Sequence, residues 1–397
     1  MALVTDRIDG SARRMAETVL PSAAAIPSFR ELDPRELVGV LNRSGYGATQ
    51  ELRFSRGPAS LEDSPGYLLP LRRLFWRGEL LSTNEAAGAL TPLNIAALVE
   101  AGVLKEEHGG VRALFQIQVY DGLYFIVDFM PEDHPTDVVL PIGPSSKYLA
   151  EITIRKPVDS ALDLGCGCGI QALLMSRHAR QVAATDINPR AVELTRLNAA
   201  LNGIMNVETL LGSYFEPVAG RTFDLLVANL PYVITPETRY IYRDTGQADD
   251  QSIRRNVEQA ALHLREGGFA QIMLNWIHAA SEAWWRPIEN WTRQRNVDGW
   301  LLYSHSQTPE QYTKQWLMID EARQPEEYAS ATRAWLTWYK QQHIERVGFG
   351  VLNLRRRSAP NNWRCSVHVS KTADEPLGKH VQHLFSAQDQ LAGVGAP

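Results

Sequence analysis

The stretch Asp163-Leu164-Gly165-Cys166-Gly167-Cys168-Gly169 decides the fold. It continues the apolar run 160–164, which predicts a buried strand, and it precedes residues 170–178, which predict a helix. Glycine has no side chain and readily adopts positive φ, so the alternating glycines let backbone amides approach a ligand closely. The stretch therefore predicts a strand, a tight binding turn and a helix.

The chain after this turn alternates strands with helices. The alternation implies crossover connections and a parallel sheet, so we expect an α/β fold with an open, Rossmann-like sheet. Further strands are expected at 181–185, 223–228, 269–274, 300–306 and 347–354, with a helix at 189–202. A helical insertion at about 309–343 separates the last two of these strands and is expected to shape a substrate pocket.

The N-terminal part has a different pattern. Helices are expected at 34–44, 68–77 and 93–102, with a helix start at 82–85, followed by strands at 113–117 and 123–127. Helices followed by a hairpin are typical of a winged-helix-like module. We therefore expect this domain at 1–130, a linker and cofactor-site entry at 131–157, and the binding domain at 158–397.

Charge argues against a large nucleic-acid footprint. The 397 residues hold 45 acids and 40 bases, a formal charge of −5, and the expected third helix, 93–100, has no Arg or Lys to meet phosphate. We therefore expect the N-terminal domain to cover the substrate or to mediate association into an oligomer.

Membrane, disulfide and metal features are not expected. No apolar run approaches the roughly 18 residues of a membrane helix, which favours a cytoplasmic location. Three cysteines cannot make an even disulfide framework, and Cys166 and Cys168 have no nearby His or Cys to complete a metal site.

A second acid narrows the choice of cofactor. Asp186 follows the second strand, where a carboxylate can accept hydrogen bonds from both ribose hydroxyls of an adenosine cofactor. A nicotinamide enzyme would place an acid there too. The G-x-G-x-x-G spacing of dinucleotide sites is absent, however, and the acid Asp163, which opens the loop, suits a cationic methionine group better than a pyrophosphate.

The motif Asn229-Leu230-Pro231-Tyr232 stands at the carboxyl end of a strand, where open α/β sheets bind ligands. The Asn229 side-chain oxygen and the Leu230 carbonyl can accept hydrogen bonds from an –NH2 group, Pro231 fixes the turn and Tyr232 offers a ring face. This arrangement would orient a nitrogen nucleophile.

The segment 161–232 resembles class I S-adenosylmethionine-dependent methyltransferases of the "small methyltransferase" group, similar to the HemK-like protein-glutamine methyltransferases. The resemblance implies a seven-stranded sheet and S-adenosylmethionine as cofactor. It also places Ser213 and Tyr214 beside the adenine and Ser146 near the methionine end. The expected cofactor-binding residues are Ser146, Asp163, Gly165, Cys166, Gly167, Gly169, Asp186, Ile187, Ser213, Tyr214 and Asn229.

Over residues 72–378 the chain also resembles a group of actinobacterial proteins regarded as methyltransferases, which have their own N-terminal domain. The segments Tyr242-Arg243-Asp244, Leu274-Asn275-Trp276 and Val347-Gly348-Phe349-Gly350 carry that likeness, which says little about substrate.

The sequence leaves several substrates open. Leu230 departs from the Asn-Pro-Pro-Tyr of the glutamine enzymes and matches the Asn-Leu-Pro-Tyr of ribosomal RNA adenine dimethyltransferases. The leading hypothesis is N-methylation of an amine or amide in a small molecule, such as a natural product, or in a protein side chain. Arg239, Tyr242 and Arg243 are candidate substrate-binding residues. Alternatives are a nucleic-acid amine methyltransferase, methylation at oxygen or sulfur, other sulfonium chemistry, and a non-catalytic binding module.

Overall fold

The structure is a computed structural model of the 397-residue chain. It describes residues 25–30, 32–47, 66, 68–130, 137–237, 243–244, 250–323, 325–369 and 377–394.

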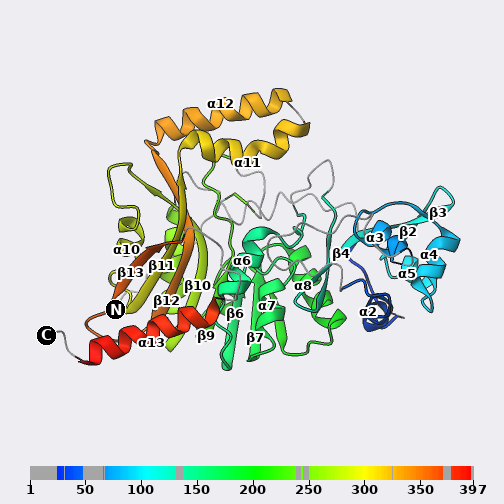
Figure 1. Ribbon diagram of the computed structural model, residues 1–397, viewed down its shortest axis with the longest axis horizontal. Coiled ribbons are helices and arrows are strands. Elements are labelled where there is room, and N and C mark those ends of the chain that lie inside the picture. Colours follow the sequence, from blue (N-terminus) through cyan, green and yellow to red (C-terminus); the bar gives the residue numbers. More distant parts are fainter. Residues whose placement is uncertain are drawn as a thin grey trace.

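The N-terminal module is a small helical unit with a three-stranded sheet (Figure 1). Its elements are α2 (Pro34–Arg43), α3 (Leu69–Phe75), β1 (Leu81–Ser82), α4 (Thr83–Leu90), α5 (Ile95–Glu100), β2 (Leu104–Glu107) and β3 (Gly110–Ala113). The side chains of Asp33, Ser82 and Asn94 each accept a backbone N–H at a helix start, which explains why α2, α4 and α5 begin there. The strand order β1-β3-β2 makes β2 and β3 the wing of this module.

A second hairpin follows the wing. It consists of β4 (Phe115–Tyr120) and β5 (Leu123–Asp128), which pair only with each other among the described strands. The sequence predicted strands close to these positions but assigned them to the wing. The true wing, 104–113, is short and partly charged, so its period-2 signal is weak.

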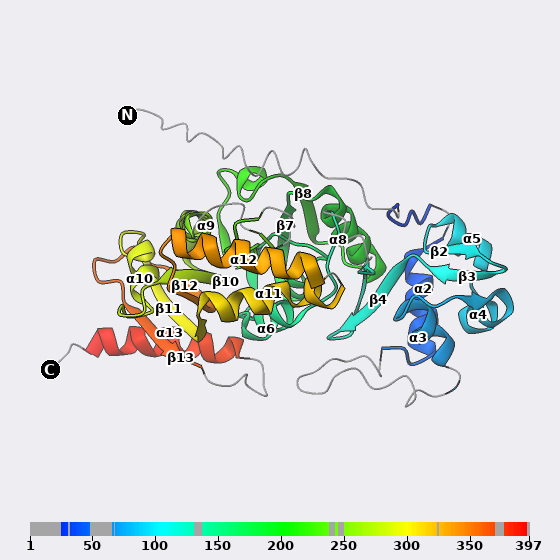
Figure 2. The same cartoon turned by 90° about the horizontal axis from the view of Figure 1, so that it is seen from above.

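The central sheet has eight strands in the order β13-β11-β12-β10-β9-β6-β7-β8 (Figures 1 and 2). They are β6 (Val158–Leu164), β7 (Ala179–Asp186), β8 (Val207–Leu211), β9 (Phe223–Ala228), β10 (Leu264–His278), β11 (Val297–Gln307), β12 (Arg346–Arg356) and β13 (Arg364–His368). Strand β12 runs antiparallel to both neighbours, and the other pairs are parallel. The short edge strand β13 adds an eighth strand to the seven expected.

Helices cover both faces of the sheet. They are α6 (Pro144–Ile152), α7 (Ile170–Met175), α8 (Pro189–Leu201), the 3-10 turn η2 (Glu216–Val218), α9 (Gln251–Leu262), α10 (Arg286–Thr292) and α13 (Gly378–Val394). Val227 and Met273 belong to the apolar core on one face, and Leu226 and Ile272 to the core on the other, as the alternation of a strand requires.

Two further helices, α11 (Pro309–Arg323) and α12 (Pro325–Gln341), connect β11 to β12. In Figure 1 they lie across one end of the sheet, above the ends of β10 to β12. Among the described residues, no helix is both long enough and apolar enough to cross a membrane.

Helix α8 binds the β4–β5 hairpin through side chains. Asn198 accepts the Ile126 N–H at 2.8 Å and donates to the Ile126 carbonyl at 3.0 Å, and Asn202 makes the same pair of bonds with Tyr124. The two asparagines therefore pair with the backbone N–H and carbonyl groups at the edge of β5, as a neighbouring strand would. At the start of α8, the buried Arg190 pairs with the buried Asp128 at the end of β5.

Candidate active site

The glycine turn folds as the sequence predicts. Gly165, Gly167 and Gly169 have φ of 75°, 54° and 84°, values that glycine adopts without strain. A Cβ on Gly165 would lie 2.9 Å from the Cδ2 of Leu230, whereas a Cβ on Gly167 would meet nothing within 4 Å. The turn is thus packed on one side and open at Gly167, where a ligand can approach the backbone.

Asp163 ends β6 with its side chain turned inward. The residue is 1% exposed, and its Oδ2 accepts the Ala172 N–H at 2.9 Å in the first turn of α7. Burial raises the pKa of this carboxyl to about 7, an effect that the Ala172 N–H opposes and the charge of Asp186 increases. Asp163 therefore anchors the helix after the turn. Its predicted role beside a cationic ligand stays a prediction.

Asp186 is held in a fixed orientation at the end of β7. Its Oδ2 accepts the Gly167 N–H and its Oδ1 accepts the Asn188 N–H, both at 2.9 Å. Burial raises the pKa of Asp186, and these N–H donors counteract the rise. The Ile187 N–H also hydrogen bonds to the carboxylate, so three of its roughly four acceptor positions are used and about one remains for a hydroxyl group.

The surroundings of the two cysteines of the turn favour a structural role. Both are buried, and burial raises the pKa of each thiol, so neither is a ready thiolate. The Thr195 hydroxyl lies 3.3 Å from the Cys166 Sγ and 3.0 Å from the Gly167 carbonyl. Among the described residues, no group of three or more His, Cys, Asp or Glu could hold a metal.

Ser213 and Tyr214 follow β8 at the same sheet edge. Tyr214 has a φ of 45°, and its hydroxyl lies 3.3 Å from the Ser252 hydroxyl of α9. Its main-chain carbonyl lies 3.5 Å from the Thr185 hydroxyl, one residue before Asp186. Tyr214 is thus placed beside the predicted ribose acid, whereas contact of the pair with an adenine stays a prediction.

Asn229 is oriented by the first turn of α6. Its Nδ2 donates toward the hydroxyls of Ser145 at 3.4 Å and Ser146 at 3.2 Å, and the Ser146 carbonyl in turn accepts from Gln171 of α7. The Asn229 Oδ1 is buried and has no hydrogen-bond partner. A buried oxygen without a donor costs free energy, so this atom is ready to accept an N–H from a ligand.

Tyr232 lies in an aromatic group. Its ring centroid is 5.8 Å from that of Phe349 on β12 and 6.2 Å from that of Trp316 on α11. Burial raises the pKa of its hydroxyl, which the Ser145 side chain counteracts by hydrogen bonding. Ser145 therefore contacts both ends of the Asn229–Tyr232 motif, with Pro231 in the turn between them.

The predicted substrate-binding residues are only partly described. Arg239 and Tyr242 lie outside the described residues. Arg243 is described, and its Nε donates to the Asp244 Oδ1 at 2.6 Å while its guanidinium lies over the Trp335 ring. The Arg243 guanidinium therefore already has partners within the protein, and its role in binding a substrate stays a prediction.

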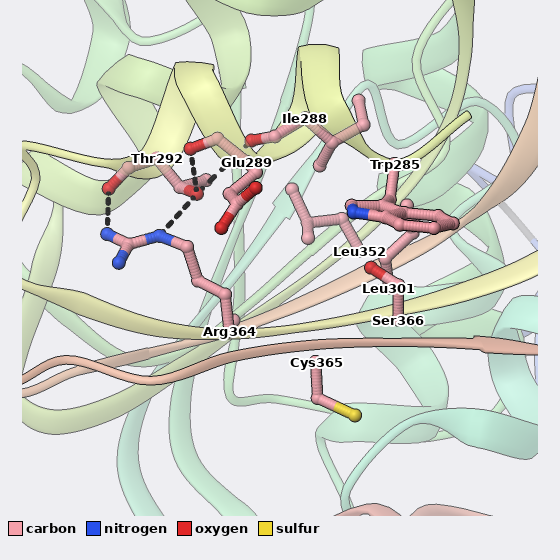
Figure 3. A pocket seen from close by; sticks show the side chains of 10 residues that line it. Trp285, Ile288, Glu289, Thr292, Leu301, Leu352, Arg364, Cys365 and Ser366 are labelled. Atoms are coloured by element: carbon pink, nitrogen blue, oxygen red, sulfur yellow. Dashed lines mark hydrogen bonds between the residues drawn. The ribbon is translucent and has the colours of Figure 1, made fainter. Parts of the chain in front are cut away.

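A separate hollow of about 160 Å³ lies between α10 and strands β11 to β13. Figure 3 shows the side chains that line it. None of the predicted site residues lines it. Its cation, Arg364, donates to the hydroxyl and the carbonyl of Thr292. The hollow is therefore a feature of the packing under α10, away from the glycine turn.

Several residues next to the motif were not predicted from the sequence as site residues. Ser145 belonged to the expected linker, and Asn275 and Phe349 were noted only as parts of a resemblance. Trp316 fell within the expected helical insertion at about 309–343. For Asn275, one signal in the sequence could have been used. It stands among apolar residues of a strand that is expected to be buried, and a buried polar side chain needs a hydrogen-bond partner.

Strand order, glycine turn, acid after the second strand and the Asn229–Tyr232 motif together define a class I methyltransferase. The family model described as "Methyltransferase small domain" matches residues 142–297. A "Release factor glutamine methyltransferase" of Aliivibrio fischeri is 30% identical over 198 residues, covering 43% of this chain and 69% of that protein. One of the same name from Aquifex aeolicus is 35% identical over 148 residues, covering 33% of this chain and 53% of that protein.

The chain belongs to the methyltransferase small domain family, the HemK-like group of class I S-adenosylmethionine-dependent methyltransferases. It spans about half the length of the first curated relatives that it matches. Among solved structures, Trm5b from Pyrococcus abyssi matches with a TM-score of 0.37 and 16% identity, covering 76% of this chain and 81% of that one.

Proposed function

We propose that this protein transfers the methyl group of S-adenosylmethionine to a nitrogen atom, an amine or amide, of a protein side chain or a small molecule. The observation that carries the proposal is the unpartnered, buried Oδ1 of Asn229, fixed by two serines beside the glycine turn. An acceptor –NH2 group would satisfy this oxygen.

The described residues fit the cofactor. Asp186 keeps an acceptor position for a ribose hydroxyl, and the open side of Gly167 admits a ligand to the backbone. Ser213 and Tyr214 would border the adenine, and Ser146 the methionine end. When bound, the cofactor supplies an electrophilic methyl group on a positively charged sulfur.

The chain's own contribution is positioning. Asn229 Oδ1 and the Leu230 carbonyl would accept the two N–H groups of the acceptor, which directs its lone pair at the methyl group, and Tyr232 would pack against the acceptor's flat face. Holding two reactants in line can supply roughly 7 to 11 kcal/mol of the barrier, so no strong acid or base is required for methyl transfer itself. The N–CH3 bond would form as the S–CH3 bond breaks, with S-adenosylhomocysteine as the leaving group. The methylated nitrogen would then lose one N–H proton to water.

The relatives bear on the class of acceptor. Two of them are named glutamine methyltransferases, which supports a side-chain amide as acceptor. A nucleic-acid acceptor is favoured by Leu230 and the winged-helix topology alone. Helix α5, which would enter a groove, has no Arg or Lys, so the N-terminal module is better suited to covering the substrate or to association.

Calorimetric titration with S-adenosylmethionine and, separately, with NAD tests the cofactor. We expect binding of the first alone and, for Asp186→Ala, an affinity weaker by roughly 1 to 3 kcal/mol through a lost charged hydrogen bond. If Asp186→Ala binds S-adenosylmethionine as tightly as the wild type, Asp186 does not bind the ribose. Mass spectrometry of glutamine peptides and small amines incubated with the cofactor then tests transfer, and absence of a 14-dalton adduct on every acceptor would contradict the proposal.

A further inference from the structure

Five side chains beside Asn229 form a closed ring of contacts. We call this set the acceptor ring, and its members are Tyr232, Asn275, Tyr312, Trp316 and Phe349. Tyr232 contacts Phe349 and Trp316, the Trp316 ring centroid is 6.0 Å from that of Tyr312, and Tyr312 shares a hydrogen bond with Asn275. Asn275 is directly opposite Phe349 in the β10–β12 ladder, which closes the ring.

Asn275 and Phe349 of the ring lie on the same face of the sheet as Asn229, whereas Tyr312 and Trp316 come from α11 and pack with the apolar core of the other face. Val227, Gln271 and Met273 share one face, and the alternation of the two strands places Asn229 and Asn275 on it as well. Ala228 pairs with Ile272, so Asn275 is one strand across and two residues along from Asn229. Strand geometry then separates the two Cα atoms by roughly 8 Å.

Two ring members have buried polar atoms without a partner. One is the Asn275 Oδ1 and the other is the indole Nε1 of Trp316. The Tyr312 hydroxyl already accepts the Ile234 N–H and contacts the Asn275 Nδ2, so whichever way the Asn275 amide is turned, one of its ends lacks a partner. Together with the Asn229 Oδ1, the motif and the ring contain three buried polar atoms without a hydrogen-bond partner.

The chemistry of the ring is neutral. Its polar atoms belong to an amide and an indole, and the described cation next to it, Arg243, is paired with the buried Asp244. Aromatic faces and neutral donors and acceptors suit a flat, uncharged group that has its own donor and acceptor, and they do not suit a phosphate.

We propose, on the basis of the proposed function, that Asn275 and Trp316 form a second subsite, which binds an amide group of the substrate remote from the methylated nitrogen. Trp316 and Tyr312 come from α11, beyond residue 297, where the family match ends. The subsite is therefore a specificity-determining addition of this chain's own insertion. The amide is the peptide bond of a protein substrate or an amide in a small molecule.

The test compares two probes that share one –NH2 group. N-acetylglutamine N-methylamide carries remote amides, and butyramide has none. Both are titrated against the protein with and without saturating S-adenosylhomocysteine, by ligand-observed NMR. We expect the first to bind about tenfold more tightly, the effect of one or two hydrogen bonds to unpaired groups. A glutamine-centred pentapeptide that binds more tightly still identifies a peptide source, and equality with the capped residue identifies a small-molecule source.

Variants locate the effect. Trp316→Phe removes only the indole N–H, and Asn275→Leu removes the amide. Each should abolish the preference between the probes while leaving the affinity for S-adenosylmethionine unchanged. Trp363→Phe is the matched control, because its Nε1 is also buried and unpartnered but lies beside Phe385 of α13.

The outcomes separate this inference from the proposed function. Equal binding of the two probes, binding of neither, or a preference retained by Trp316→Phe overturns the subsite. Methyl transfer to both probes at equal efficiency would leave the proposed function standing and remove the subsite. Absence of cofactor binding would remove the proposed function, while the probe preference of the cofactor-free protein still decides the subsite.

Discussion

The cofactor half and the acceptor half of the site are built in different ways. Around the glycine turn, the groups described above are satisfied locally: Asp163 and Asp186 accept N–H groups within nine and nineteen residues of themselves. Around Asn229, the contacts come from α6, β10, α11 and β12, and polar atoms are left without partners. The groups around the glycine turn are thus paired within the chain, whereas those around Asn229 would be paired by the proposed acceptor.

The largest expected effect comes from breaking the acceptor half. Asn229→Ala should lower turnover about 10²- to 10³-fold, because the atom that orients the acceptor is lost, and should leave cofactor affinity within about twofold. Steady-state turnover and calorimetry measure the two quantities. The exposed Asn361→Ala is the control, and wild-type turnover by Asn229→Ala would exclude Asn229 from the mechanism.

The next effect tests whether the cofactor half depends on the hairpin. Asn198→Ala would leave the Ile126 backbone and the Cys168 carbonyl of the glycine turn without their partner, so we expect a loss of about 3 kcal/mol in the free energy of unfolding. Urea denaturation followed by circular dichroism measures it. Asn202→Ala, at a half-buried position, should cost less, and equal losses would contradict this view.

The buried acid of the cofactor half should make stability depend on pH. The folded-state pKa of Asp163 is raised from 3.8 to about 7, so its stabilising contribution is complete below pH 3.8 and is lost as the pH rises through 7. Asp163→Asn should match the wild-type free energy of unfolding at pH 4 and exceed it by about 4 kcal/mol at pH 8, since each unit of the pKa shift is worth about 1.4 kcal/mol. Denaturation at both pH values checks this, and a constant difference would show that Asp163 is not buried as a protonated acid.

The smallest effect distinguishes the packed side of the turn from its open side. Gly167→Ala places a residue with a Cβ at a φ of 54°, which should cost about 1 kcal/mol of stability and weaken cofactor binding. Gly165→Ala should be more destabilising, since its Cβ would lie 2.9 Å from Leu230. Thermal unfolding ranks the two, and the reverse order would mean that the turn is packed at Gly167.

The contrast also explains what the sequence could predict. The turn, its flanking strand and helix, and Asp186 were readable because glycine spacing and strand-end acids act over short stretches of chain. The position of Asn229 at the end of β9 was readable from adjacent residues, and its catalytic role stays a prediction. The acceptor ring was not, because cross-strand pairing and the path of α11 bring Asn275, Trp316 and Phe349 together from segments up to 74 residues apart.

The errors of prediction have a similar cause. The eighth strand β13 is five residues long and has a charged and polar pattern, so its pairing with β11 depends on the neighbour and not on its own sequence. The second hairpin was mistaken for the wing because its six-residue strands are the more apolar pair. Two of the N-terminal helices were predicted where they start because Asp33 and Ser82 mark those positions, whereas α5 was expected from residue 93 and begins at Ile95, after Asn94.

The asparagine pair on α8 has a mechanical consequence. Asn198 donates at once to Ile126 of the hairpin and to Cys168 of the glycine turn. Rotating the hairpin away from α8 would leave buried backbone groups of both segments unpaired, at a cost of several kcal/mol. The β4–β5 hairpin and the glycine turn are therefore held rigidly together through Asn198. A displacement of β5 would move the backbone of the glycine turn with it.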